Sequence, residues 1–137
     1  MAGHPRACTN HFPGMSAVCR KGELAKNISA LQALAPQLFT FLPASWCLPA
    51  DLNALKDHLR AVRDGSRAST HPLTFIVKPV KGSQGAGIQL CPAHLPSITR
   101  AAQEAADDVG ARGAREVVVS EYISNPLLLE GRKFDLR

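Results

Sequence analysis

The segment FIVKPVKGSQGAGIQL, residues 75–90, places the strongest constraint on the fold of this chain. An apolar, β-prone run leads into Lys78 and Pro79, three glycines follow within six residues, and a second β-prone run closes the segment. β-prone runs on both sides of a short glycine-containing stretch are typical of a hairpin. We therefore expect two strands joined by a glycine-rich connection.

The glycine spacing leaves two interpretations of this connection open. Gly82, Gly85 and Gly87 give G-x-x-G-x-G, which differs from the Walker loop and from the dinucleotide fingerprint, and both of those motifs open a helix rather than a strand. One interpretation is a hairpin that folds over phosphates, because glycine lets backbone N–H groups approach an anion and Lys78 adds a point charge. The other interpretation is an ordinary flexible hairpin turn.

The rest of the chain predicts an α+β fold. Residues 16–35 space Leu24, Ile28, Leu31 and Ala35 as one face of an amphipathic helix that Pro36 stops. Further helices are predicted over 51–65, with Leu52, Leu55, Leu59 and Val62 on one side, and over 97–110, with Ser97 as N-cap and Gly110 as stop. Strands are predicted over 73–77, 87–90, 115–123 and near the end of the chain, and residues 66–72 form the most linker-like segment.

The last seven residues, GRKFDLR, predict a strand with two unlike faces. The period of two places Lys133, Asp135 and Arg137 on one face and Phe134 and Leu136 on the other. We expect the apolar face to pack. The charged face is either a candidate site or a solvated edge strand.

Composition favours some partners and disfavours others. The formal net charge of +5 favours an anionic partner. Nucleic acid is disfavoured because the basic residues are scattered and because five Phe, one Tyr and one Trp give little stacking surface. No run approaches the roughly 20 apolar residues of a membrane span. The four cysteines lack a C-x-x-C pair, which suggests reduced thiols, and no ligand pair at zinc spacing follows His4, Cys8 and His11, so we expect no metal site there.

Five blocks of the sequence resemble the tubulin tyrosine ligase-like family. They are NHFPGM (10–15), CRKGELAKN (19–27), FLPASWCLPAD (41–51), FIVKPVKGSQGAGI (75–88) and YISNPLLLEGRKFDLR (122–137). The combination of NHFPGM, CRK and WCLPAD looks most like the polyglutamylase branch of the family. The resemblance runs in the same order from about residue 10 to the last residue.

The resemblance implies an ATP-grasp fold, with a small N-terminal domain over residues 1–70 and the first part of the central domain over residues 71–137. It implies an ATP- and Mg2+-dependent ligase that activates a carboxylate as an acyl-phosphate and joins free glutamate to glutamates in the acidic C-terminal tails of tubulin. The implied location is the cytoplasm and the microtubule cytoskeleton, with the cilium or basal body as options.

The resemblance also assigns roles to residues. It implies that Arg137 acts catalytically near the transferred phosphate and the acceptor carboxylate. It implies that Lys21, the second candidate catalytic residue, faces the same cleft from the N-terminal domain; the alternative for Lys21 is a solvated helix lysine. It implies nucleotide binding for Lys78, Gly82, Ser83, Gln84, Gly85, Gly87, Ile88, Glu121, Tyr122, Ile123, Lys133 and Asp135. Within this set, the strand Glu121–Ile123 is expected to run behind the adenine, and Asp135 is expected at the ribose.

The chain departs from the family pattern at two positions. Ala86 stands where polyglutamylases often have arginine, and Ser120 stands where many members have glutamine. The family's magnesium ligands are expected beyond residue 137, so we expect these 137 residues alone to have negligible ligase activity. The alternative is a short protein that binds nucleotide or microtubules without turnover.

Overall fold

The computed structural model describes residues 12–65, 73–108 and 116–135. In chain order its elements are α1 (Ser16–Cys19), α2 (Lys21–Leu34), β1 (Ser45–Leu48), α3 (Leu52–Arg63), β2 (Thr74–Pro79), β3 (Gln89–Pro92), α4 (Leu95–Asp108), β4 (Val117–Glu121), β5 (Leu128–Leu129) and β6 (Arg132–Lys133).

A four-stranded antiparallel sheet with the order β1-β4-β2-β3 is the centre of the fold. β2 and β3 pair directly, with Val77 opposite Gln89, so the predicted hairpin around the glycine segment is confirmed. β5 and β6 form a separate two-stranded hairpin. The α+β prediction is confirmed at the level of a mixed fold of helices and sheet.

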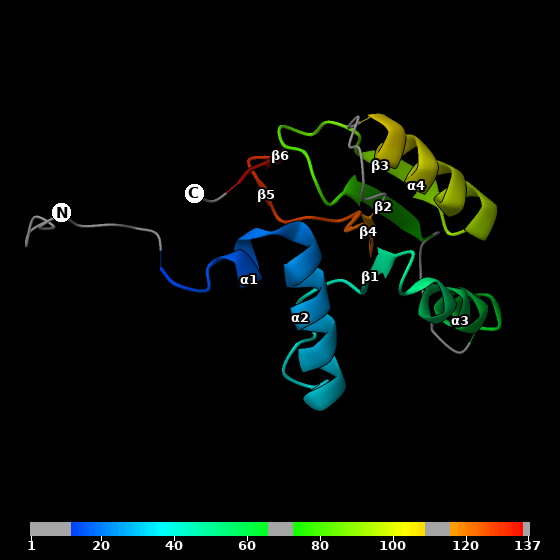
Figure 1. The fold of residues 1–137 in the computed structure, drawn as a ribbon, viewed down its shortest axis with the longest axis horizontal. Helices are drawn as coiled ribbons and strands as arrows, with labels where there is room; N and C mark the ends of the chain where they lie inside the picture. Colours follow the sequence, from blue (N-terminus) through cyan, green and yellow to red (C-terminus); the bar gives the residue numbers. More distant parts are fainter. Residues whose placement is uncertain (1–11, 66–72, 109–115, 136–137) are drawn as a thin grey trace, which may run out of the picture.

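One face of the sheet packs against α3 and α4 (Figure 1). Phe75 and Val77 of β2, Leu55 of α3 and Ile98 of α4 are fully buried there. Burying four large apolar side chains stabilises the fold by about 1.5–3 kcal/mol each, before the cost of chain ordering is subtracted. This face is the main core.

The opposite face of the sheet packs against α2 (Figure 1). Its buried cluster is small and consists of Ala25 of α2 with Cys47 and Val118 of the sheet, and Val80 is partly buried against it. Because side chains alternate along a strand, Ile76 and Lys78 of β2 point to this second face. The α2 face is therefore only partly covered and keeps room for a site.

The single helix predicted over residues 16–35 is wrong in two respects. The helix is interrupted at Arg20, whose extended backbone separates α1 from α2. Its buried residues are Gly22 and Ala25, whereas Leu31 on the predicted apolar face is 39% exposed. Small residues face the sheet because they allow close packing, which an apolar periodicity does not predict.

Helix α3 follows the prediction, with Leu55 buried and Leu52 and Leu59 packed against the core. The predicted N-cap Ser97 is wrong, because α4 begins at Leu95 and Ser97 lies inside its first turn. The predicted stop at Gly110 and the linker at 66–72 lie outside the described residues.

Strand β1 was not predicted, because Leu-Pro pairs on both sides of it suggested only breaks. It pairs with β4, so the sheet takes strands from both sides of the predicted boundary between residues 70 and 71. The division into two domains stays a prediction.

The strand predicted over the last residues is short. Among the described residues 131–135, the strand covers Arg132–Lys133, and Phe134 remains 38% exposed. The expected packing of its apolar face is therefore not seen at Phe134. Of the helices in the described parts of the chain, none has both the length and the apolar character needed to cross a membrane.

Candidate functional site

The glycine hairpin has a backbone that few other sequences could adopt. Gly82, Gly85 and Gly87 have φ angles of 116°, 82° and 67°, and Gln84 has 56°. These positive values are accessible to glycine without a steric penalty. Two short-range hydrogen bonds shape the tip, from the Ala86 amide to the Ser83 carbonyl (3.2 Å) and from the Ile88 amide to the Gly85 carbonyl (3.3 Å).

A pocket of about 280 Å³ opens next to this region. Its lining is formed by Pro43, Ile76, Lys78, Ser120, Glu121, Tyr122, Ile123, Pro126 and Lys133. Lys78 comes from β2 and Lys133 from β6, so the fold brings together two lysines that are far apart in the sequence. Two ammonium groups above apolar walls favour an anionic ligand that also has an apolar or aromatic part.

The predicted site residues divide into three groups. Lys78, Glu121, Tyr122, Ile123 and Lys133 line the pocket. The hairpin residues are close to it in sequence but do not line it; all are exposed except Gly87, which is buried. Asp135 is exposed and outside the lining, and Arg137 lies outside the described residues.

Glu121 contributes to the pocket differently from its neighbours. Its carboxylate contacts His58 of α3, with 2.8 Å between Oε1 and Nε2, and the two side chains are 15% and 12% exposed. The His58 ring in turn lies against Trp46, with 4.6 Å between ring centroids. The Glu121 side chain therefore belongs to the α3 side of the sheet, which leaves its backbone for the pocket.

The backbone of this strand end is partly engaged within the fold. The Glu121 amide donates to the Ala44 carbonyl at 3.0 Å, and the Tyr122 amide donates to the Thr74 carbonyl at 2.8 Å. A ring bound along this strand would have to use other backbone groups of residues 121–123. The predicted backbone hydrogen bonds to an adenine therefore cannot use the amides of Glu121 and Tyr122 while these bonds persist. They would use the carbonyls of residues 121–123 and the amide of Ile123.

Lys21 reaches the hairpin itself. Its ammonium donates to the carbonyl of Pro79 at 2.9 Å and to the carbonyl of Gly82 at 3.0 Å. The structure therefore places Lys21 at the base of the hairpin, beside the predicted phosphate-binding region. Sequence reasoning did not anticipate these contacts, because they join residues about 60 positions apart.

Several pocket residues carry no sequence signal of their own. Pro43, Ile76 and Pro126 form the apolar part of the lining. The hydroxyl of Ser120 hydrogen-bonds to that of Ser45 across β1 and β4, at 2.8 Å. The alternation of β2 could have placed Ile76 beside Lys78, whereas the two prolines are brought in only by tertiary packing.

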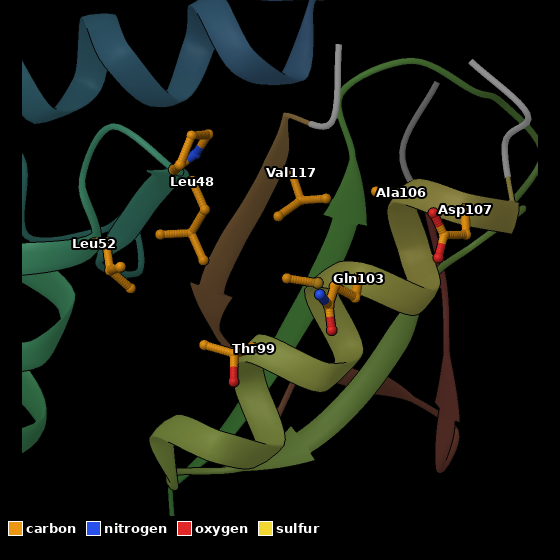
Figure 2. A pocket seen from close by; sticks show the side chains of 9 residues that line it. Leu48, Leu52, Thr99, Gln103, Ala106, Asp107 and Val117 are labelled. Carbon is orange, nitrogen blue, oxygen red and sulfur yellow. The ribbon is translucent and has the colours of Figure 1, made fainter. Parts of the chain in front are cut away.

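Two further cavities share no lining residue with this pocket, have larger volumes, and differ from it in the chemistry of their linings. Figure 2 shows one of about 400 Å³ between β1, α3 and α4, lined by apolar groups with Thr99, Gln103 and Asp107. Among the described residues that line this cavity, Asp107 is the charged one, and a carboxylate does not suit a phosphate. The other, of about 490 Å³, includes Lys56, Arg60 and Arg63, but the two arginines are already paired with Asp57 and Asp64.

The described parts of the chain contain neither a cluster of metal ligands nor a buried cysteine with a lowered thiol pKa. Across residues 12–65, 73–108 and 116–135, no group of three or more His, Cys, Asp or Glu side chains lies together as a metal site would require. Burial raises the pKa of the Cys91 thiol, and burial followed by the charge of Asp51 raises the pKa of the Cys47 thiol. Both are poor nucleophiles, because the thiolate is the reactive form.

Fold and site together define a mixed α/β protein with a cationic pocket beside a glycine hairpin. The profile of the tubulin-tyrosine ligase family matches residues 2–137. The chain therefore belongs to the tubulin-tyrosine ligase family.

Three relatives illustrate its place in that family. The chain is 39% identical over 128 residues to mouse tubulin polyglutamylase TTLL6, covering 93% of this chain and 13% of that protein. It is 38% identical over 128 residues to human TTLL6, covering 93% and 12%. It is 35% identical over 130 residues to human tubulin polyglutamylase TTLL7, again covering 93% and 12%. The chain thus spans about an eighth of the length of these curated relatives.

Proposed function

We propose that this chain is the nucleotide-binding part of an ATP-dependent tubulin glutamate ligase with an ATP-grasp fold. The observation that carries the proposal is the meeting of Lys78 and Lys133 at one pocket beside the glycine hairpin. The two strands that supply these lysines resemble the nucleotide-binding strands of the family. Its relatives are tubulin polyglutamylases by name.

The residues present fit ATP. Lys78 and Lys133 supply positive charge for the phosphates, and the glycine hairpin supplies backbone that can approach them closely. Ile76, Pro43 and Pro126 form an apolar wall for a purine ring. When bound, ATP supplies the phosphoryl group that activates a carboxylate, and this chain's residues hold and orient it.

Magnesium has no comparable support among the described residues, which contain no cluster of acidic ligands. The resemblance assigns the magnesium ligands to later strands. We therefore expect the 137 residues alone to bind nucleotide and to give no ladder of added glutamates with MgATP, glutamate and tubulin. A clear ladder would contradict this expectation.

The proposed substrates are free glutamate and the acidic C-terminal tails of tubulin, which places the protein at the microtubule cytoskeleton. The relatives' names supply the substrate class. A chain with a net charge of +5 also attracts an acidic peptide at long range. Arg137 is proposed to act near the transferred phosphate and the acceptor carboxylate, Lys21 to face the same cleft, and Asp135 to contact the ribose.

The test is calorimetric titration of MgATP into the 137-residue chain. Replacing Lys78 by Met removes one phosphate-directed charge, and we expect binding at least about tenfold weaker, as for loss of a charged hydrogen bond. Lys133→Met should act in the same direction. Lys56→Met is the matched control, because Lys56 lines the separate cavity of about 490 Å³ that also includes Arg60 and Arg63. Equal affinity in wild type and Lys78→Met would refute this site.

A further inference from the structure

The first turn of α2 touches the base of the glycine hairpin through two adjacent residues, Lys21 and Gly22. The Lys21 ammonium bridges the carbonyls of Pro79 and Gly82, which lie on either side of the point where the chain leaves β2. An ammonium donates three hydrogen bonds, and two of them go to these carbonyls. Because the donor is charged, each bond is stronger than a neutral one.

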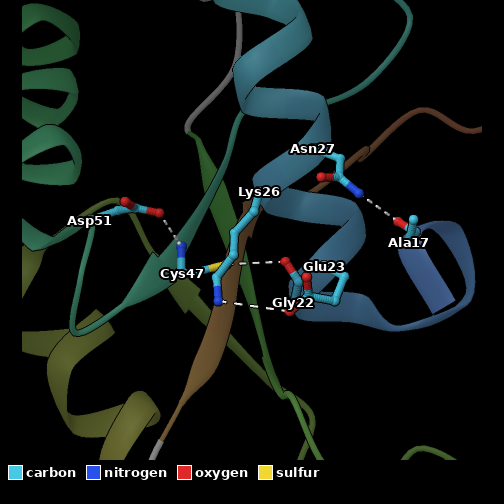
Figure 3. A network of polar contacts seen from close by, with 7 residues as sticks. All are labelled: Ala17, Gly22, Glu23, Lys26, Asn27, Cys47 and Asp51. Carbon is cyan, nitrogen blue, oxygen red and sulfur yellow. Dashed lines mark hydrogen bonds and ion pairs between the residues drawn. The ribbon is translucent and has the colours of Figure 1, made fainter. Parts of the chain in front are cut away.

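Gly22 brings the helix close enough for these bonds to form. A Cβ at Gly22 would lie 3.3 Å from both Cγ atoms of Val80, a tight contact that the glycine avoids. The Gly22 carbonyl accepts a weak hydrogen bond from the Cys47 thiol, with a distance of 3.6 Å (Figure 3). The Val80 amide in turn donates a hydrogen bond of 3.1 Å to the carbonyl of Glu116, the residue before β4.

The contact with Gly82 reaches the first unusual backbone position of the hairpin. Gly82 has a φ of 116° and is exposed, so few packing contacts hold it in that conformation. The hydrogen bond from Lys21 links it to a helix that packs on the sheet. Among the described contacts of residues 83–88, the backbone hydrogen bonds outside the strands are the two at the tip.

We propose that Lys21 and Gly22 form an anchor that fixes the base of the glycine hairpin against α2 and so sets the position of the hairpin beside the pocket. Lys21 is then a positioning residue, whatever further contact its third N–H makes. The identity of the hairpin's ligand rests on the proposed function. The anchor itself rests only on contacts within this chain.

The first test is nuclear magnetic resonance of the ¹⁵N-labelled 137-residue chain. In Lys21→Met we expect the amide signals of Gly82 to Gly85 to shift and their ¹H–¹⁵N nuclear Overhauser effects to fall, because the base has lost both bonds. Lys21→Arg retains a charged donor and should restore most of the wild-type values. Lys26→Met is the control on the same helix, since Lys26 is 47% exposed and pairs only weakly with Glu23, at 3.9 Å. Hairpin signals in Lys21→Met that match wild type would overturn the proposal.

The second test separates the anchor from general damage. Gly22→Ala keeps Lys21 but pushes the helix from Val80, so it should disturb the same hairpin amides. Adding Val80→Ala removes both methyl groups that the new Cβ would meet, and the double variant should recover the wild-type signals. Signals from Ile98 and Val119 in the main core report whether each variant stays folded. Failure of Val80→Ala to rescue a folded Gly22→Ala variant would overturn the part assigned to Gly22.

Titration of MgATP into the same variants distinguishes the two proposals. If wild type binds ATP, Gly22→Ala binds it more weakly and the Gly22→Ala, Val80→Ala double variant binds it as wild type does, both stand, because neither residue is a proposed ligand contact. If wild type binds no ATP but the hairpin still loosens in Lys21→Met, the anchor is supported and the proposed function fails. Loosening of the hairpin with unchanged ATP affinity would overturn the claim that the anchor positions it for the pocket.

Discussion

Glu121 shows how one residue serves both faces of the sheet. Its carboxylate contacts His58 on the main-core face, and its backbone borders the pocket on the other face. Since the His58 ring also contacts the rings of Trp46 and Phe75, the pair of His58 and Glu121 connects the packing of the core to the strand end that shapes the pocket.

Replacing His58 by Phe should keep the ring packing and remove the contact with Glu121. We expect a loss of about 1–3 kcal/mol in the free energy of unfolding, as for a largely buried acceptor that loses one partner. Urea denaturation measures this loss. In a double-mutant cycle, Glu121→Gln should cost less in the His58→Phe background than in wild type, and strictly additive costs would contradict a coupled pair.

Cys47 makes stability depend on pH. Burial and then the charge of Asp51 raise the pKa of its thiol above the ordinary value of 9.0. A raised folded-state pKa contributes stability that is fully present below pH 9 and is lost as pH rises toward the folded pKa, because the unfolded thiol ionises first. Denaturation at pH 7 and at pH 10 should show a decrease with a slope of at most about 1.4 kcal/mol per pH unit from this thiol. Cys47→Ala should show a smaller decrease, and the same decrease in both proteins would assign it to other groups.

At the scale of elements, regular apolar patterns predicted the strands and α3 better than they predicted α2. The continuous apolar run predicted β2, whose burial alternates in the structure, and the spacing of Leu52, Leu55 and Leu59 matches their burial. Helix α2 buries Gly22 and Ala25 because the sheet approaches it closely, and small residues give no apolar period. β1 was missed for a different reason. It is flanked by Leu-Pro pairs that indicate breaks, and its pairing with β4 is what identifies it as a strand.

The residues of the candidate site also divide into those that the sequence predicted and those that only the structure shows. Lysine-bearing strands and the glycine spacing pointed to Lys78, Lys133 and the hairpin from sequence and family resemblance. The contacts of Lys21 and the proline walls of the pocket depend on residues far apart in the chain, so only the folded arrangement reveals them.

The hairpin conformation itself can be tested at Gly85. Its φ of +82° disfavours any side chain, although a Cβ there would meet nothing within 4 Å. Gly85→Ala should therefore alter the hairpin through backbone strain alone, at a cost of about 1–2 kcal/mol locally. We expect weaker MgATP binding and a melting temperature lower by several degrees, because strain in the folded state subtracts from the free energy of unfolding. Ala86→Ser is the control on the same exposed loop, because Ala86 lacks a positive φ and is outside the predicted binding set, and equal effects of the two changes on MgATP affinity would refute a conformational cause.

At the scale of the whole molecule, the main core draws on both halves of the sequence. Trp46, Leu48 and Leu55 come from before residue 70, and they pack with Phe75 and Val119 from after it. β1 also forms one outer strand of the sheet by pairing with β4. Removing the first half would take α3 away from the main-core face, so that α4 alone covered it, and would leave an edge of β4 unpaired.

We therefore predict that residues 71–137 expressed alone do not unfold cooperatively, although the proposed domain boundary falls at their start. Circular dichroism during urea titration should show a broad, shallow change for this fragment and a single sigmoidal transition for the 137-residue chain. Leu55→Ala in the whole chain removes part of the same packing, with an expected cost of about 2–5 kcal/mol, because Leu55 is fully buried in the core cluster that also contains Phe75 and Val119. A sharp transition in the fragment would show that residues 71–137 hold a core of their own and that β1 and α3 are additions to it.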